Sequence, residues 1–275
     1  MTNKKTQDTD SQKSSSLKTT VLFFVLTFVL SIPFMVISAI TKIEIMPGLP
    51  IAAICTICPM LAALILVYRE DKKAGVVRLL QRSFDYKRIK ARAWYLPILL
   101  LMPVVMIISF FIIRLIGIAI PAPVINVFST LILCVIFFIG ALGEELGWSG
   151  YAIDPMQKSM GALPASLALG IIWAVYHYVG LAEVNRSVVW ILWWSLGSIA
   201  IRVIMVWIFN NSGKSVFAMA LFHMTINVTW QLFPVSGSYY NPKITGLVLT
   251  LVTVCVMTFY DPKTFLWKKA NKKSK

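Results

Sequence analysis

The chain contains two adjacent glutamates and only two histidines, and their positions suggest hydrolytic chemistry. Glu144 and Glu145 stand at the end of a long apolar run, while His177 and His223 lie inside later apolar runs. Ionisable side chains in apolar segments are costly unless they face one another or a wet cavity. Because carboxylates and imidazoles together can activate water, we expect these residues to form one hydrolytic site.

Two hydrolytic mechanisms are compatible with these residues. Glu144, His177 and His223 can hold a divalent metal such as zinc, which activates water for attack on a carbonyl. Alternatively, with no cofactor, Glu144 and one histidine deprotonate water directly, while the other histidine and Asn227 bind the oxyanion. The sequence has no HExxH motif and therefore leaves open whether the site binds a metal. Adjacent helical residues point about 100° apart, so we assign chemistry to Glu144 and support to Glu145.

Each residue also has a purely structural interpretation. The acidic pair can lie in water at the end of a membrane helix and cap it. A buried histidine is often a packing residue. However, Trp173 and His177 share one helix face at a spacing of four, as do His223 and Asn227. The combination of these pairs with the chain's only histidines favours a functional site.

The composition identifies an integral membrane protein. Hydrophobic residues make up 58% of the chain and charged residues 13%, whereas soluble domains have about 25% charged residues. The net charge of +15 comes from basic blocks beside apolar runs, mainly at 69–92. We therefore expect contact with anionic lipid headgroups and no binding of nucleic acid. The Cys55-x-x-Cys58 pair lies within an apolar run and is interpreted as two small apolar residues.

The apolar runs predict an all-α polytopic bundle of about eight transmembrane helices. The expected spans are residues 20–40, 51–68, 94–120, 124–143, 164–180, 188–209, 215–233 and 244–260. They form a single domain at 20–261, between a disordered tail at 1–19 and a basic tail at 262–275. With both termini in the cytoplasm, Lys42, Arg186 and Lys243 are the only external basic residues, as the positive-inside rule favours. We expect a multi-pass protein of a bacterial plasma membrane.

The depth of the acidic pair requires an adjustment of these spans. If the fourth span begins at Val124, Glu144 lies at the cytoplasmic edge, away from the two histidines. The residues can meet if the span begins near Phe128 and continues past Trp148. The fifth span then follows an interfacial stretch that ends near Ala165.

Residues 124–230 resemble the CPBP family of intramembrane proteases, which includes CAAX prenyl endopeptidases and bacteriocin-processing or self-immunity proteins. The family's first motif, EExxxR, corresponds to GEELGWSGY at 143–151. The second motif, an aromatic followed four residues later by histidine, corresponds to Trp173 and His177. The third, HxxxN, corresponds to His223 and Asn227. The resemblance implies that Glu144 and these histidines activate water against a peptide bond, with Asn227 in support. We expect Glu145 and Trp173 to be supporting residues.

One position departs from the family pattern, because Ser149 replaces the arginine of the first motif. The loss of a cation beside Glu145 can impair activity, and Arg202 in a neighbouring span is a candidate replacement. Three functions therefore stay open: a peptidase acting on a membrane-associated protein or peptide, a non-catalytic immunity or regulatory protein that binds a peptide in the same cavity, and a transporter using Glu144 as proton carrier. The sequence does not indicate whether the substrate is prenylated.

Overall fold

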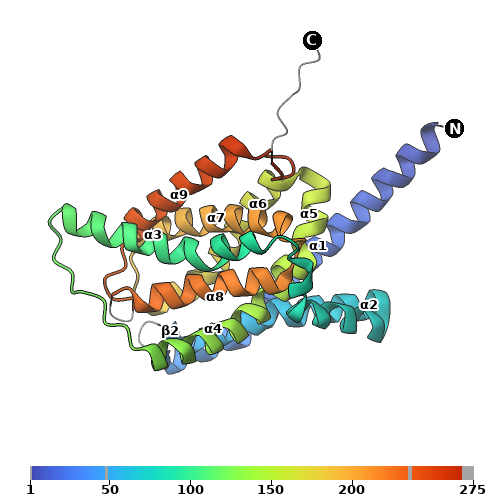
Figure 1. The fold of residues 1–275 in the computed structure, drawn as a ribbon. Coiled ribbons are helices and arrows are strands. Elements are labelled where there is room, and N and C mark those ends of the chain that lie inside the picture. Colours follow the sequence, from blue (N-terminus) through green and yellow to red (C-terminus); the bar gives the residue numbers. More distant parts are fainter. Residues whose placement is uncertain (1, 47–48, 235–236, 268–275) are drawn as a thin grey trace, which may run out of the picture.

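The protein is a bundle of α-helices (Figure 1). The computed structural model describes residues 2–46, 49–234 and 237–267, with side chains from residue 18 onward. The main helices are α1 (Thr2–Thr41), α2 (Cys58–Gln81), α3 (Tyr95–Leu115), α4 (Val127–Gly147), α5 (Ile153–Met160), α6 (Ala162–Glu183), α7 (Val188–Asn211), α8 (Val216–Leu232) and α9 (Pro242–Phe259). Two short strands, β1 (Glu44–Met46) and β2 (Leu49–Pro50), pair between α1 and α2. The predicted all-α class is confirmed.

Short helical turns connect these elements. A 3₁₀ helix, η1 (Ile51–Ile57), precedes α2, and a π-helical turn, η5 (Trp148–Ala152), follows α4. Three further 3₁₀ turns lie between α2 and α3: η2 (Arg82–Phe84), η3 (Tyr86–Arg88) and η4 (Arg92–Trp94).

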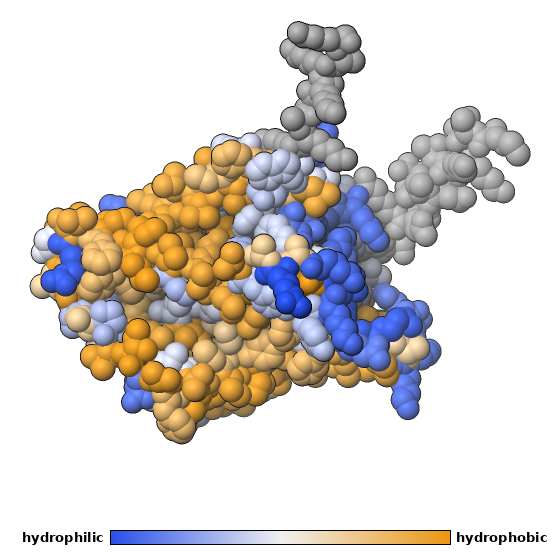
Figure 2. Space-filling model, in the orientation of Figure 1, coloured by the Kyte–Doolittle hydropathy of each residue, from blue (hydrophilic) through white to orange (hydrophobic). Residues whose placement is uncertain are grey.

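Seven helical stretches in the described part of the chain are long and apolar enough to cross a membrane. The 17 residues of α8 form a shorter apolar helix, which corresponds to the predicted seventh span. Figure 2 shows apolar side chains over the flanks of the helices and hydrophilic ones gathered at the end where α2 and α5 lie. This distribution fits a multi-pass membrane protein, and the placement of both termini in the cytoplasm stays a prediction.

Side-chain caps fix where the helices that carry the later motifs begin. Ser187 accepts a hydrogen bond from a backbone N–H in the first turn of α7, and Ser215 does the same for α8. Such caps satisfy N–H groups that the helix itself leaves unpaired. Asp85 accepts from Ser215 Oγ at 2.6 Å and from the backbone N–H of Phe217 at 3.1 Å. The basic loop thereby anchors the start of α8.

Helix α4 packs closely against the start of α2. A Cβ added at Gly147 would lie 2.5 Å from the carbonyl oxygen of Pro59, and one added at Gly143 would lie 2.7 Å from that of Thr56. The helical path then continues through η5 into α5. The expectation that the fourth span continues past Trp148 is therefore confirmed.

Helix α1 continues back to Thr2, and the disorder expected for residues 1–19 stays a prediction. At the other end, the backbone N–H of Ala162 donates to the carbonyl of Lys263 at 2.8 Å, and Phe265 is fully buried. Residues 262–267 thus cover the start of α6, which lies at Ala162, before the predicted Ala165. Residues 268–275 lie outside the described part.

Candidate active site

Glu144 lies in the last turn of α4 and is held by two tryptophans. Its side chain is 3% exposed. Oε2 accepts hydrogen bonds from the indole N–H of Trp148 at 3.0 Å and from that of Trp173, on α6, at 2.7 Å. Indole nitrogens can only donate, so these bonds suit an ionised carboxylate and fix its orientation.

The two histidines are oriented through their Nδ1 atoms. His177 Nδ1 lies 2.7 Å from the carbonyl oxygen of Trp173, and His223 Nδ1 lies 3.0 Å from Glu145 Oε1. A carbonyl or carboxylate oxygen can only accept, so Nδ1 carries the proton in both rings. In the neutral form of each ring, Nε2 is unprotonated and can accept a hydrogen bond.

Trp173 lies between the two histidines. Its ring centroid is 5.1 Å from that of His177 and 5.4 Å from that of His223, and both contacts are edge-to-face. The same side chain donates to Glu144. The aromatic residue of the second motif therefore contacts all three ionisable residues predicted to do the chemistry.

Glu145 is fully buried and, unlike Glu144, does not line the cavity. Arg202 Nη1, from α7, lies 3.2 Å from Oε1 and 3.1 Å from Oε2 of this carboxylate. The Ser149 hydroxyl also donates to Oε2. Arg202 therefore pairs with the second glutamate, as its position in a neighbouring span suggested, and the supporting role of Glu145 stays a prediction.

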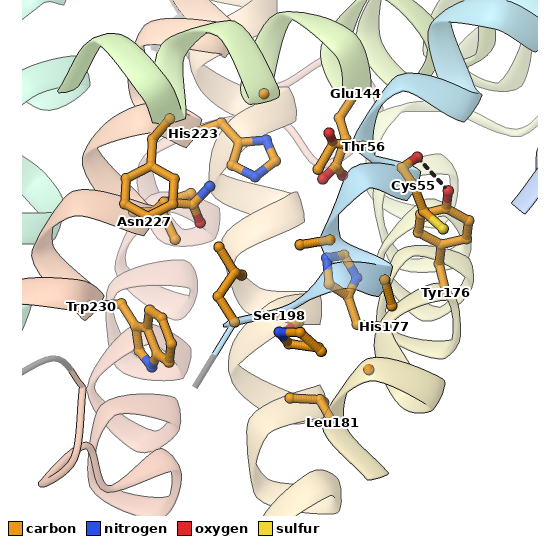
Figure 3. A pocket seen from close by; sticks show the side chains of 18 of the residues that line it. Cys55, Thr56, Glu144, Tyr176, His177, Leu181, Ser198, His223, Asn227 and Trp230 are labelled. Carbon is orange, nitrogen blue, oxygen red and sulfur yellow. Dashed lines mark hydrogen bonds between the residues drawn. The ribbon is translucent and has the colours of Figure 1, made fainter. Parts of the chain in front are cut away.

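The four candidate residues line one cavity of about 460 Å³. Figure 3 shows Glu144, His177, His223 and Asn227 projecting toward the same space from α4, α6 and α8. The rest of the lining is mainly apolar and includes Met102, Met106, Ile136, Ile201, Ile226 and Trp230. A few polar groups in an apolar pocket are typical of a ligand site. The structure thus brings together the residues that the three motifs singled out.

The cavity residues do not form a metal site in this structure. In the part of the chain that the structure describes, no group of three His, Cys, Asp or Glu side chains is placed to hold a metal ion. The candidate ligand set Glu144, His177 and His223 is therefore not assembled. The choice between a metal-bound and a directly activated water stays a prediction to be tested.

Two aromatic residues near the site were not predicted from the sequence. Tyr176 donates to the carbonyl oxygen of Cys55 at 2.7 Å and thereby fixes η1 against α6. Trp194, on α7, lies 5.4 Å from the His177 ring between centroids. Tyr176 directly precedes a motif histidine and could have been noted for that reason. Trp194 is one of several tryptophans in its span, and the sequence does not distinguish it from them.

Comparison with known proteins gives two matches. Residues 126–229 match the family described as Rce1-like type II CAAX prenyl endopeptidase. The chain is also 27% identical, over 246 residues, to CAAX prenyl protease 2 of Methanococcus maripaludis, and the match covers 84% of this chain and 86% of the relative. The family match includes the four candidate residues Glu144, His177, His223 and Asn227 and confirms the resemblance found in the sequence.

Proposed function

We propose that the chain, whose residues 126–229 match the Rce1-like family of type II CAAX prenyl endopeptidases, is an intramembrane endopeptidase in which Glu144 activates water. Its substrate is a membrane-associated protein or peptide. The observation that carries the proposal is the buried carboxylate of Glu144, held by two indoles at the edge of a cavity that two oriented imidazoles share.

The proposed reaction begins with a water molecule beside Glu144. The carboxylate takes one proton from the water, and the water oxygen attacks the carbonyl carbon of the scissile peptide bond. Nε2 of His177 or His223 accepts the second hydrogen of this water and so directs its lone pair. The C–N bond then breaks, and Glu144 returns its proton to the leaving amine.

Asn227 is the proposed donor to the oxyanion. Its carboxamide has two N–H bonds and lies one turn after His223 on the same helix, where it lines the cavity. With Nδ1 protonated, a neutral histidine cannot donate from Nε2, so the amide is better suited to this role than the second imidazole. Donors aimed at the developing charge in a water-poor site are worth several kcal/mol of barrier, roughly 3 to 4 for one donor.

The apolar lining suits a substrate that arrives from the membrane. Apolar side chains of α3, α4, α7 and α8 surround the polar end of the cavity, so an apolar segment or a lipid-modified residue can be buried there. The relative from M. maripaludis is named a CAAX prenyl protease. We therefore include a prenylated C-terminal Cys-a-a-X peptide among the substrates to be tested.

The test uses the purified full-length protein in proteoliposomes. Peptides ending in Cys-a-a-X, with and without a farnesyl group on the cysteine, are incubated with the wild type and with Glu144→Gln, and the products are identified by mass spectrometry. We expect the wild type to cleave at least one peptide and Glu144→Gln to lose about 10²- to 10⁴-fold in rate. Glu70→Gln, which changes an exposed glutamate outside the cavity, is the matched control.

Two outcomes would contradict the proposal. Equal cleavage by the wild type and Glu144→Gln would remove the site assignment. Saturable binding of the peptides by the wild type without any cleavage would instead support the non-catalytic peptide-binding function.

A further inference from the structure

We infer that Arg202 is a positioning residue, which through Glu145 fixes the imidazole of His223 for catalysis. The inference rests on the proposed function, because His223 is taken to orient the reacting water. Arg202 itself is not among the residues lining the cavity. Its effect therefore has to pass through the side chains that it contacts.

Glu145 needs a partner for its charge. Its side chain is 0% exposed, in a helix that crosses the apolar part of the protein. A carboxylate in such surroundings requires a paired cation or several donors. Arg202 Nη1 contacts both carboxylate oxygens, at 3.2 and 3.1 Å, and is itself buried. The arginine therefore allows Glu145 to be present as an anion.

The Glu145 anion also contacts His223. Glu145 Oε1 receives the Nδ1–H of His223 at 3.0 Å, while Ser149 donates to Oε2. An anionic oxygen can only accept, which selects the tautomer with its proton on Nδ1. Carboxylates that accept from the far nitrogen of a functional histidine commonly fix both tautomer and ring orientation. Arg202 thus determines which nitrogen His223 presents to the cavity.

Arg202 is unusual as a structural residue. Its Nε and Nη2 atoms are buried without a hydrogen-bond partner among the described residues. Its Cζ lies 4.5 Å from the centroid of the Trp173 ring, so the charge also faces that ring. Buried ion pairs with unsatisfied donors contribute little or negatively to stability. A functional role explains why such a pair lies beside the site.

The backbone of α6 is adapted to this placement. A Cβ added at Gly170 would lie 3.0 Å from Cα of Ile199 and 3.2 Å from Cβ of Arg202. Glycine therefore lets α6 and α7 approach closely, with Arg202 against Trp173. Position 149 also reaches the Glu145 carboxylate, since the Ser149 hydroxyl donates to it. A cation placed at 149 can therefore substitute for one at 202.

Two double variants test the inference. In Glu145→Gln/Arg202→Met both charges are removed together, which usually leaves the stability of a buried pair unchanged or improved. In Ser149→Arg/Arg202→Ser the two side chains are exchanged, so the cation is kept but comes from the other helix. Arg114→Met is the control, because Arg114 is an exposed arginine in the last turn of α3.

The first readout is steady-state cleavage with kcat and KM determined separately. We expect the neutral double variant to lose about 10- to 100-fold in kcat, with little change in KM. We expect the exchanged variant to recover most of that loss and Arg114→Met to match the wild type. A merely structural pair would not give this combination, because the neutral variant would keep its kcat.

The second readout does not depend on activity. The chain has only two histidines, so ¹⁵N-labelled histidine gives two imidazole spectra, which His177→Asn assigns. The wild type should show His223 as a single tautomer with its proton on Nδ1. Since a carboxamide can donate as well as accept, the neutral variant should show a mixture, and the exchanged variant should restore one tautomer.

The outcomes separate this inference from the proposed function. If the wild type cleaves no peptide, the proposed function fails, and the tautomer of His223 in the three proteins alone decides the inference. Wild-type kcat and an unchanged His223 spectrum in the folded neutral variant would overturn it. So would a mixture of His223 tautomers in the wild type itself.

Discussion

The indole N–H of Trp173 donates to Oε2 of Glu144 at 2.7 Å and so links α6 to the last turn of α4. The ring of the same tryptophan is in edge contact with both histidines. One side chain therefore sets the direction of the proposed base and the spacing of the imidazoles around it. The site depends on this contact between two helices that the π-helical turn η5 and the short helix α5 separate in the sequence.

Replacing Trp173 with phenylalanine tests the role of the N–H group. Phe keeps a ring beside His177 and His223 but cannot donate to Glu144. We expect kcat to fall about 10- to 100-fold, as is usual when a partner that orients a catalytic group is lost. The free energy of unfolding should fall by only about 1 to 3 kcal/mol for the lost hydrogen bond, because Oε2 of Glu144 keeps its bond from Trp148.

The measurement is kcat together with the melting temperature in detergent. Trp267→Phe is the control, since Trp267 is 62% exposed and lies outside the cavity. A Trp173→Phe protein with wild-type kcat would show that the indole N–H does not position Glu144.

Removal of divalent metals tests the choice between the two hydrolytic mechanisms. Because no three potential ligands are grouped in the described part of the chain, we expect cleavage to continue at the wild-type rate after dialysis against a chelator. The metal content of the active protein should be well below one ion per chain. Activity that is lost with the chelator and restored by Zn²⁺ would instead require Glu144, His177 and His223 to close around a metal.

Asn227 offers a test of the proposed oxyanion donor. Asn227→Ala should reduce kcat by about 10²- to 10³-fold, as for the loss of one oxyanion donor in other hydrolases, with KM nearly unchanged. Gln231→Ala is the matched control, because Gln231 lies one turn further along α8 and does not line the cavity. If Asn227→Ala raised KM alone, the amide would bind the substrate and not the transition state.

The close packing of α4 on α2 gives a prediction about stability. Gly147→Ala places a Cβ only 2.5 Å from the carbonyl oxygen of Pro59. The Cβ of Gly140→Ala would meet only Thr56 Oγ1, at 4.0 Å. We expect Gly147→Ala to lower the free energy of unfolding by about 1 to 3 kcal/mol or more. Gly140→Ala should leave it unchanged or slightly raised, because alanine favours the helix.

Thermal unfolding in detergent compares these two alanine variants directly. Equal melting temperatures for Gly147→Ala and Gly140→Ala would show that α4 can move away from α2 without loss. Activity should follow the same order, since a shift of α4 also moves Glu144.

Much of the fold could be predicted from the sequence, because membrane helices follow from the length of apolar runs. The spacing of Trp173 from His177 and of His223 from Asn227 places each pair on one helix face, which predicted their shared side of the cavity. The family match supports these positions, and their catalytic roles stay predictions.

Other features could not be predicted, because they depend on packing between distant segments. The partner of Glu145 could only be suggested, since an arginine in an apolar span can pair with any acid nearby or extend to the interface. The placement of residues 262–265 depends on backbone hydrogen bonds from the start of α6 to Pro262 and Lys263. The π-helical turn η5 keeps Glu144 in the interior while the chain continues into α5, and its sequence carries no local signal for this turn.

A single turnover in H₂¹⁸O tests most directly the claim that Glu144 activates water and is not itself the nucleophile. The protein is mixed in excess over the cleavable peptide, and both the product and the Glu144-containing fragment are weighed by mass spectrometry. We predict one ¹⁸O in the new carboxyl group of the product after the first turnover and none in Glu144. An unlabelled first product with ¹⁸O in Glu144 would contradict the account, because it would require a covalent intermediate on that carboxylate.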